Sequence, residues 1–147
     1  MTKEKTSKKQ NIFFQIIGVE LLGTTINHPQ KQLPKRINFH FKINLEYKIN
    51  VDKKFVFVAT FVTVSDKNDK ETQLGTITTS CNFKISNLDE FMDKENNEVL
   101  FPDEILFMFN SISISTTRGI MFSQFKGTFL DHAYLPIIDP KSFKLNK

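Results

Sequence analysis

The chain has 147 residues, a formal net charge of +4 and one cysteine. This length favours a single domain with one core, because a chain of roughly this size buries about two-thirds of its unfolded surface on folding. The lone Cys81 excludes an intramolecular disulfide and a multi-cysteine metal site, and it fits a reducing compartment, so we expect a cytoplasmic protein.

Much of the positive charge lies near the two ends of the chain. Lysines gather in the first nine residues, and Lys141, Lys144 and Lys147 fall in the last seven. We expect residues 1–10 to form a disordered basic leader, 11–143 a single domain and 144–147 a short basic tail. Because a nucleic-acid reader groups Lys and Arg on one face or element, we expect no nucleic-acid partner.

The first two expected strands differ in pattern. Ile12 to Thr24 is apolar and β-branched and is followed by the turn-prone Asn27-His28-Pro29. No run in the chain reaches the roughly eighteen uninterrupted apolar residues of a membrane span, so we expect a soluble protein without membrane insertion. Ile37 to Val51 places apolar residues at every odd position, a period of two that predicts a long antiparallel strand with one solvent-facing side.

The next two expected strands form a hairpin. Phe55 to Val64 is apolar on both faces, so it needs a cover on both, a helix on one side and, for example, a partner subunit on the other. The polar run from Ser65 to Lys70 is the expected hairpin loop, and Thr72 to Ser86 returns as the fourth strand. Four successive strands predict a meander-like antiparallel sheet.

A long helix is expected after the sheet. Pro102, Asp103 and Glu104 mark its start, because Pro is tolerated in the first turn and carboxylates favour the positive end of the helix dipole. The helix then runs to about Phe125. Its hydroxyl-rich middle, residues 110–117, would allow another helix to approach closely, and the hydroxyls can bond to their own backbone carbonyls.

No residue pattern points to catalysis. His28, His40 and His132 are not spaced as metal ligands, and the five glycines never cluster as they do in phosphate-binding loops. The acidic pairs at 89–90 and 103–104 lie at element ends, where capping and solvation explain them. Cys81 lies in an apolar strand pattern that predicts an inert core thiol. We therefore expect a non-enzyme without metal or cofactor.

Three segments resemble the SecB-like export chaperones. Val99 to Gly119 looks like the start of that family's long helix, with Leu-Phe-Pro at its entry and an Arg-Gly pair near its far end. Phe13 to Leu21 resembles the family's opening strand, and Leu135 to Phe143 resembles the segment after the helix. The likeness spans about Ile12 to Phe143, and the segments follow the family's order.

The resemblance implies an α+β fold, a four-stranded antiparallel sheet with a long helix packed across it, assembled as a dimer of dimers. It also implies an ATP-independent holdase that binds unfolded or precursor polypeptides in hydrophobic grooves, with protein export as its setting. Family members that dock onto the SecA motor have a second helix, an acidic tail and an acidic sheet face. This chain has a basic tail and a mixed second strand, and both features count against SecA as a partner. A dedicated role in guarding an antitoxin stays open.

Client contacts are expected on the helix and the neighbouring strands, because a Phe- and Met-rich surface binds many sequences without demanding one geometry. The expected client-binding residues are Phe55, Phe57, Phe61, Phe107, Met108, Met121, Phe122 and Phe125. The expected contacts between copies in the homotetramer are Ile112, Ser113, Thr116 and Thr117. Gly119 costs about 1 kcal/mol in a helix relative to Ala, so we expect Arg118 and Gly119 to be structural, at a close helix contact.

Two other functions stay open. A hotdog-type thioesterase has a similar outline, but it needs a carboxylate facing an acyl cleft, and the helix has none between Ile105 and Phe125. A scaffold protein could use the same oligomer to hold one native partner.

Overall fold

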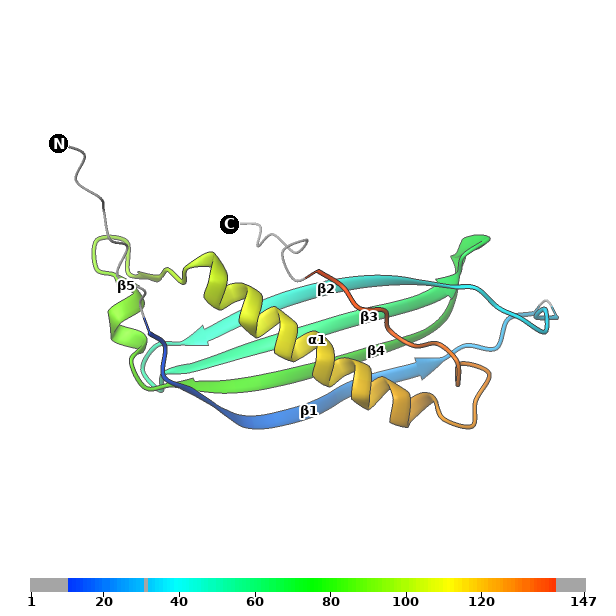
Figure 1. Cartoon of the computed structure of the whole chain (residues 1–147), viewed down its shortest axis with the longest axis horizontal. Helices are drawn as coiled ribbons and strands as arrows, with labels where there is room; N and C mark the ends of the chain where they lie inside the picture. The colour runs from blue at the N-terminus through cyan, green and yellow to red at the C-terminus, as the bar shows by residue number, and fades with distance from the viewer. Residues whose placement is uncertain (1–10, 31, 140–147) are drawn as a thin grey trace.

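The computed structural model describes residues 11–30 and 32–139. The expected leader, residues 1–10, and the expected tail, residues 144–147, lie outside this described part. The elements in chain order are β1 (Phe14–Ile26), β2 (Phe39–Asn50), β3 (Phe55–Asp66), β4 (Asp69–Ile85), the 3-10 helix η1 (Leu88–Phe91), β5 (Met92–Asp93), β6 (Glu98–Val99) and α1 (Asp103–Phe125). Four long strands therefore precede one long helix, as the sequence predicts (Figure 1).

The four long strands form one antiparallel sheet in the order β1-β4-β3-β2. β2, β3 and β4 are a meander, but β1 departs from the expected pattern, because it lies at the opposite edge from β2 and pairs with β4. Val19 of β1 is the partner of Cys81, which is also the partner of Val58. The connection between β1 and β2, residues 27–38, is too long for a tight hairpin, so β1 is free to reach the far edge.

One face of the sheet is covered by α1. The pairing of Ile43 with Val62 and of Tyr47 with Val58 puts the odd-numbered residues of β2 on the same face as the valines of β3. The four valines of β3 are at most 1% exposed. The period of two in β2 thus directs its apolar side towards the helix.

The opposite face, which we call the open face, carries the phenylalanines of β3. Phe55, Phe57 and Phe61 are partly buried and belong to neither buried core cluster. The rings of Phe55 and Phe57 meet edge to face at 6.1 Å. Of the two covers expected for β3, the described part of the chain supplies the helix alone.

Helix α1 begins where the sequence predicts, with Pro102 directly before Asp103 and Glu104 in the first turn. It crosses the sheet over β3 and β4 (Figure 1). By length and composition it is apolar enough to cross a membrane, a property that the core helix of a globular protein also has. Its buried side, which packs on the sheet, consists of Ile105, Phe109, Asn110, Ser113, Ile114, Thr117, Met121 and Phe125.

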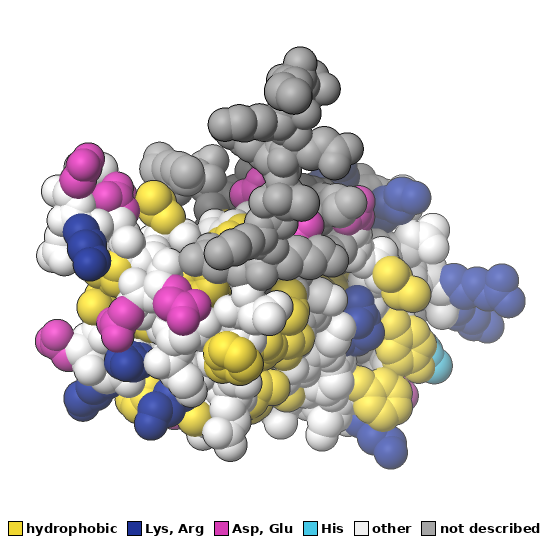
Figure 2. Space-filling view, turned by 60° about the vertical axis from the view of Figure 1, so that its left-hand side comes forward, with side chains coloured by type: hydrophobic (Ala, Val, Ile, Leu, Met, Phe, Trp, Pro, Cys, Tyr) yellow, Lys and Arg dark blue, Asp and Glu magenta, His cyan; other side chains and the backbone are white. Residues whose placement is uncertain are grey.

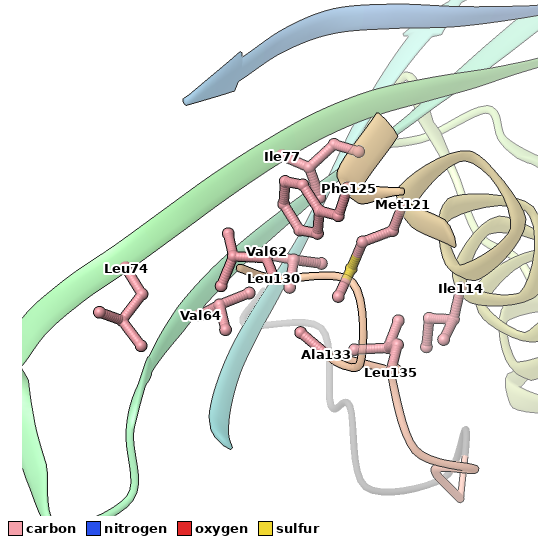
Figure 3. Close-up of a cluster of buried hydrophobic side chains, with 10 residues drawn as sticks. All are labelled: Val62, Val64, Leu74, Ile77, Ile114, Met121, Phe125, Leu130, Ala133 and Leu135. Atoms are coloured by element: carbon pink, nitrogen blue, oxygen red, sulfur yellow. The ribbon is translucent and has the colours of Figure 1, made fainter. Parts of the chain in front are cut away.

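Two hydrophobic clusters between α1 and the sheet form the core. The first lies at the C-terminal half of α1 (Figure 3) and consists of Val62, Val64, Leu74, Ile77, Ile114, Met121, Phe125, Leu130, Ala133 and Leu135. The second lies at the N-terminal half of α1 and consists of Val56, Val58, Cys81, Phe83, Ile85, Leu88, Phe91, Ile105 and Phe109. Cys81 is a free, buried thiol, as the sequence predicts.

A seam of buried polar side chains separates the two clusters. Thr60, Thr79, Asn110, Ser113 and Thr117 are each at most 1% exposed. The hydroxyls of Thr79 and Thr117 are 2.7 Å apart, and Thr117 also donates to the carbonyl of Ser113 at 2.7 Å, the back-bonding expected for this part of the helix. Within residues 11–30 and 32–139, the hydroxyls of Thr60 and Ser113 find no hydrogen-bond partner.

Candidate functional site

Edge strand β1 presents the longest run of exposed apolar side chains. We call this run, Ile16, Ile17, Val19, Leu21 and Leu22, the apolar strip, and its side chains are between 41% and 55% exposed. One edge of β1 pairs with β4, and the other pairs with no described strand. An unpaired edge with apolar side chains is a template for pairing with another chain. Figure 2 shows hydrophobic side chains reaching the surface across the middle of the displayed face.

Two irregularities explain why neighbouring apolar residues of β1 are both exposed. The register shifts between Ile16 and Gly18 and again between Leu21 and Gly23. Each shift adds one residue to β1, so that Ile17 and Leu22 have no direct partner on β4. Neighbouring apolar residues can therefore both be exposed.

A second apolar surface lies over the C-terminal half of α1. It is an open pocket of about 520 Å³ lined by Ser115, Arg118, Gly119, Phe122, Ala133 and Tyr134, and we call it the helix pocket. The rings of Phe122 and Tyr134 are stacked with centroids 6.1 Å apart, and each side chain is more than half exposed. A pocket of this size lies in the range of ligand pockets.

Arg118 holds one wall of the helix pocket in place. Its Nε donates to the carbonyl of Leu135 and its Nη2 to the carbonyl of Pro136, each at 2.8 Å. The structural role expected for Arg118 thus consists of fixing the segment after α1. An added Cβ at Gly119 would meet nothing within 4 Å, so the described part of the chain contains no close contact there.

The eight expected client-binding residues do not lie together. Phe55, Phe57 and Phe61 point to the open face, on the other side of the sheet from the helix. Phe107 and Met108 are partly exposed on α1, and Phe122 lines the helix pocket. Met121 and Phe125 are 1% exposed in the first core cluster, so they offer no surface to a client in this conformation.

The four expected contacts between copies are divided in the same way. Ser113 and Thr117 are buried against the sheet of their own chain. Ile112 and Thr116 are partly exposed on α1. Ser113 and Thr117 thus allow α1 to approach its own sheet closely, and Ile112 and Thr116 stay a prediction for the contact between copies.

Little in the described residues suggests catalysis. No three His, Cys, Asp or Glu side chains gather as a metal site would require, within residues 11–30 and 32–139. Tyr47 donates a hydrogen bond to Oδ1 of Asn110, and burial raises the pKa of its phenol far above the ordinary value of 10.0. A buried, hydrogen-bonded phenol with so high a pKa stays protonated and serves as structure.

Sequence patterns missed the apolar strip and Tyr134. The first strand was expected to be an ordinary strand, but Ile16-Ile17 and Leu21-Leu22 each break a period of two, and each pair is followed by a glycine. That combination is the signal of a β-bulge. Tyr134 follows the helix by several residues, so only the path of the chain places it beside Phe122.

The arrangement of this sheet and helix is the SecB-like fold. Among solved structures, the chain is similar to the Mycobacterium tuberculosis Rv1957 SecB-like chaperone, which was solved in complex with a ChAD peptide from the Rv1956 HigA1 antitoxin. The TM-score is 0.55, the match covers 85% of this chain and 90% of that chain, and the sequence identity is 11%. No protein-family model and no curated protein matches the sequence. The resemblance to SecB-like chaperones is thus confirmed in the fold.

Proposed function

We propose that this protein is an ATP-independent holdase that binds unfolded or precursor polypeptides on exposed apolar surface. The observation that carries the proposal is the apolar strip of β1. The helix pocket adds a second apolar surface, and the fold of the chain is SecB-like. Exposed apolar side chains that adjoin one another along an edge strand support a site of interaction. The solved neighbour binds a peptide from another protein, which supports polypeptide clients for this chain.

The proposal includes a homotetramer built as a dimer of dimers. Edge strand β1 supports it, because a second copy that paired along its free edge would extend the sheet and cover part of the apolar strip. One part of the apolar strip would then contact the second copy, and the rest of the strip and the helix pocket would bind clients.

A second candidate is a dedicated chaperone of a toxin–antitoxin system. The observation in its favour is the peptide bound to the solved neighbour, which comes from an antitoxin. A dedicated chaperone would bind one segment of one partner tightly and would protect unrelated unfolded proteins poorly.

The proposed setting is the cytoplasm, and protein export is the proposed process. Neither a nucleotide nor a cofactor takes part, and no reaction is catalysed. SecA is a weaker partner candidate, because the open face of β2 is not acidic overall. Its ionisable side chains are those of His40, Lys42, Glu46 and Lys48. A scaffold role would instead appear as binding to one native protein.

The test is the aggregation of a chemically unfolded model protein, followed by light scattering without nucleotide. We expect the wild-type protein to suppress aggregation at near-stoichiometric ratios. Phe122→Ser should weaken suppression several-fold, because it removes an aromatic ring that is 52% exposed and that stacks on Tyr134.

Gln124→Ser is the matched control, since Gln124 is exposed on the same helix and does not line the helix pocket. If both variants suppress aggregation equally well, the helix pocket does not take part in client binding. Failure of the wild-type protein with several unrelated clients, together with tight binding to one partner segment, would favour the dedicated chaperone.

A further inference from the structure

A second pocket opens at the end of the sheet where α1 terminates. Its volume is about 340 Å³, and it lies between the β1–β2 connection and the turn after α1. The lining residues are Lys35, Arg36, Ile37, Asn38, Phe39, Phe129 and His132. We call it the basic pocket. At the right-hand side of Figure 2, which shows this end of the molecule, Lys, Arg and His side chains lie beside exposed hydrophobic ones.

The floor of the basic pocket is apolar and packs against the core. Ile37, Phe39 and Phe129 are partly buried and pack against the first core cluster. The ring of His28 lies 5.1 Å from the ring of Phe129. A side chain bound in this pocket would therefore contact aromatic carbon that the core already holds in position.

The rim of the basic pocket carries two cationic side chains, those of Lys35 and Arg36. Lys35, Arg36 and His132 are exposed, and within residues 11–30 and 32–139 no carboxylate forms an ion pair with Lys35 or Arg36. The carboxylates of Asp66 and Asp131 belong to neighbouring segments, but neither residue lines the pocket. Positive charge is thus available to a ligand directly above an aromatic floor.

Backbone hydrogen bonds fix both walls of the basic pocket. The carbonyl of Asn38 accepts from the amide of Lys67 at 2.8 Å, which ties the β1–β2 connection to the β3–β4 turn. In the turn after α1, Asp131 donates to Thr128 at 3.1 Å and Ala133 donates to Leu130 at 2.9 Å. A pocket with fixed walls loses little conformational entropy when a ligand binds.

We infer that the basic pocket binds an acidic polypeptide segment, one that presents a carboxylate next to an aromatic or large aliphatic side chain. The inference rests on the proposed function and adds a charge preference among clients. The chain's own ends are poor occupants, because residues 1–10 and 141–147 are rich in lysine. Single-stranded nucleic acid fits less well, because its bases stack on exposed aromatic faces, whereas Phe39 and Phe129 are partly buried in the floor of the pocket.

Fluorescence anisotropy of short labelled peptides tests the inference. One peptide alternates Asp with Phe and Leu, and its neutral counterpart has Asn at each Asp position. We expect the acidic peptide to bind more tightly than the neutral one and to weaken as salt is added. The double variant Lys35→Gln, Arg36→Gln should weaken acidic-peptide binding about tenfold, since it removes two charge-assisted contacts.

The matched control is the double variant Lys53→Gln, Lys94→Gln, which changes the net charge equally at two exposed positions outside the pocket. It should weaken binding by less than about twofold, because surface charges beyond a Debye length are screened. Equal losses in the two double variants, or tighter binding of oligothymidylate than of the acidic peptide, would overturn the inference.

The aggregation assay separates this inference from the proposed function. If the wild-type protein suppresses aggregation but binds acidic and neutral peptides equally, the charge preference is overturned and the holdase stands. If the acidic peptide binds in the pocket but no client is protected, the holdase is overturned and the pocket assignment stands.

Discussion

Buried polar side chains weaken the middle of the contact between α1 and the sheet. The hydroxyls of Thr60 and Ser113 have no hydrogen-bond partner in the described part of the chain, and a buried polar group without one costs about 1–3 kcal/mol. Thr79 and Thr117 satisfy each other at 2.7 Å. The two hydrophobic clusters therefore contribute most of the stability of the contact between α1 and the sheet, and the polar seam between them adds little.

At the residue scale, Tyr47→Phe should lower the free energy of unfolding by about 1–2 kcal/mol near neutral pH. It removes the phenol that donates to Oδ1 of Asn110, a side chain that is 1% exposed. Urea unfolding of the two proteins measures the difference. An unchanged midpoint would mean that Asn110 finds another donor.

Tyr47→Phe should also change how the free energy of unfolding depends on pH above about pH 10. The pKa of Tyr47 is raised in the folded protein, so above about pH 10 the unfolded chain loses this proton while the folded chain keeps it. The unfolded state then binds fewer protons, and stability falls as pH rises from about 10 towards the raised pKa. In Tyr47→Phe this contribution is absent, so the difference between the two proteins should shrink above about pH 10.

At the scale of elements, glycines in neighbouring strands have opposite roles. Gly75 of β4 lies under the turn after α1, where an added Cβ would come 2.6 Å from Cδ1 of Leu130 and 2.9 Å from the carbonyl oxygen of Thr25. Gly23 of β1 has nothing within 4 Å of the same added atom. Close approach of backbone and core thus requires glycine at one position and not at the other.

Gly75→Ala should therefore destabilise the protein by about 1–3 kcal/mol, because the added methyl group overpacks the core against backbone that cannot move aside. Gly23→Ala is the matched control and should change stability by less than about 1 kcal/mol. Thermal unfolding of both variants compares them directly. Equal tolerance of the two substitutions would show that Leu130 and β1 yield easily.

At the scale of the whole molecule, the proposed assembly of copies depends on the exposed edge of β1. The proposed homotetramer has a mass of about 68 kDa, four times 17.1 kDa. Light scattering should find that mass for the wild-type protein. Val19→Lys with Leu21→Lys should reduce it, because charge on an edge strand opposes pairing with another chain.

Thr24→Lys is the control for this prediction, since Thr24 is exposed on the same strand but lies outside the apolar strip. A wild-type mass near 17 kDa would reject the tetramer and leave the whole strip to clients. A tetramer that persists in the double lysine variant would move the contact between copies away from β1.

The sequence by itself determined the number, type and order of the main elements. The period of two in β2 and the Pro-Asp-Glu start of α1 are local patterns, set by alternation across a pleated strand and by the dipole of a helix. Three segments of the chain also resemble SecB-like chaperones, and this resemblance predicts the fold that the structure has.

Only the tertiary structure decided which of these patterns meet. β1 pairs with β4 across a long connection, and two register shifts in this pairing leave Ile17 and Leu22 without a partner and exposed. Phe57 and Phe122 were both expected to bind clients, but they lie on opposite sides of the sheet, so they do not form one surface. Lys35 and Phe129 are far apart in the chain, and they share a pocket because the chain folds back after α1. Long-range contacts of this kind depend on the path of the chain, and the local periodicity of the sequence contains no information about that path.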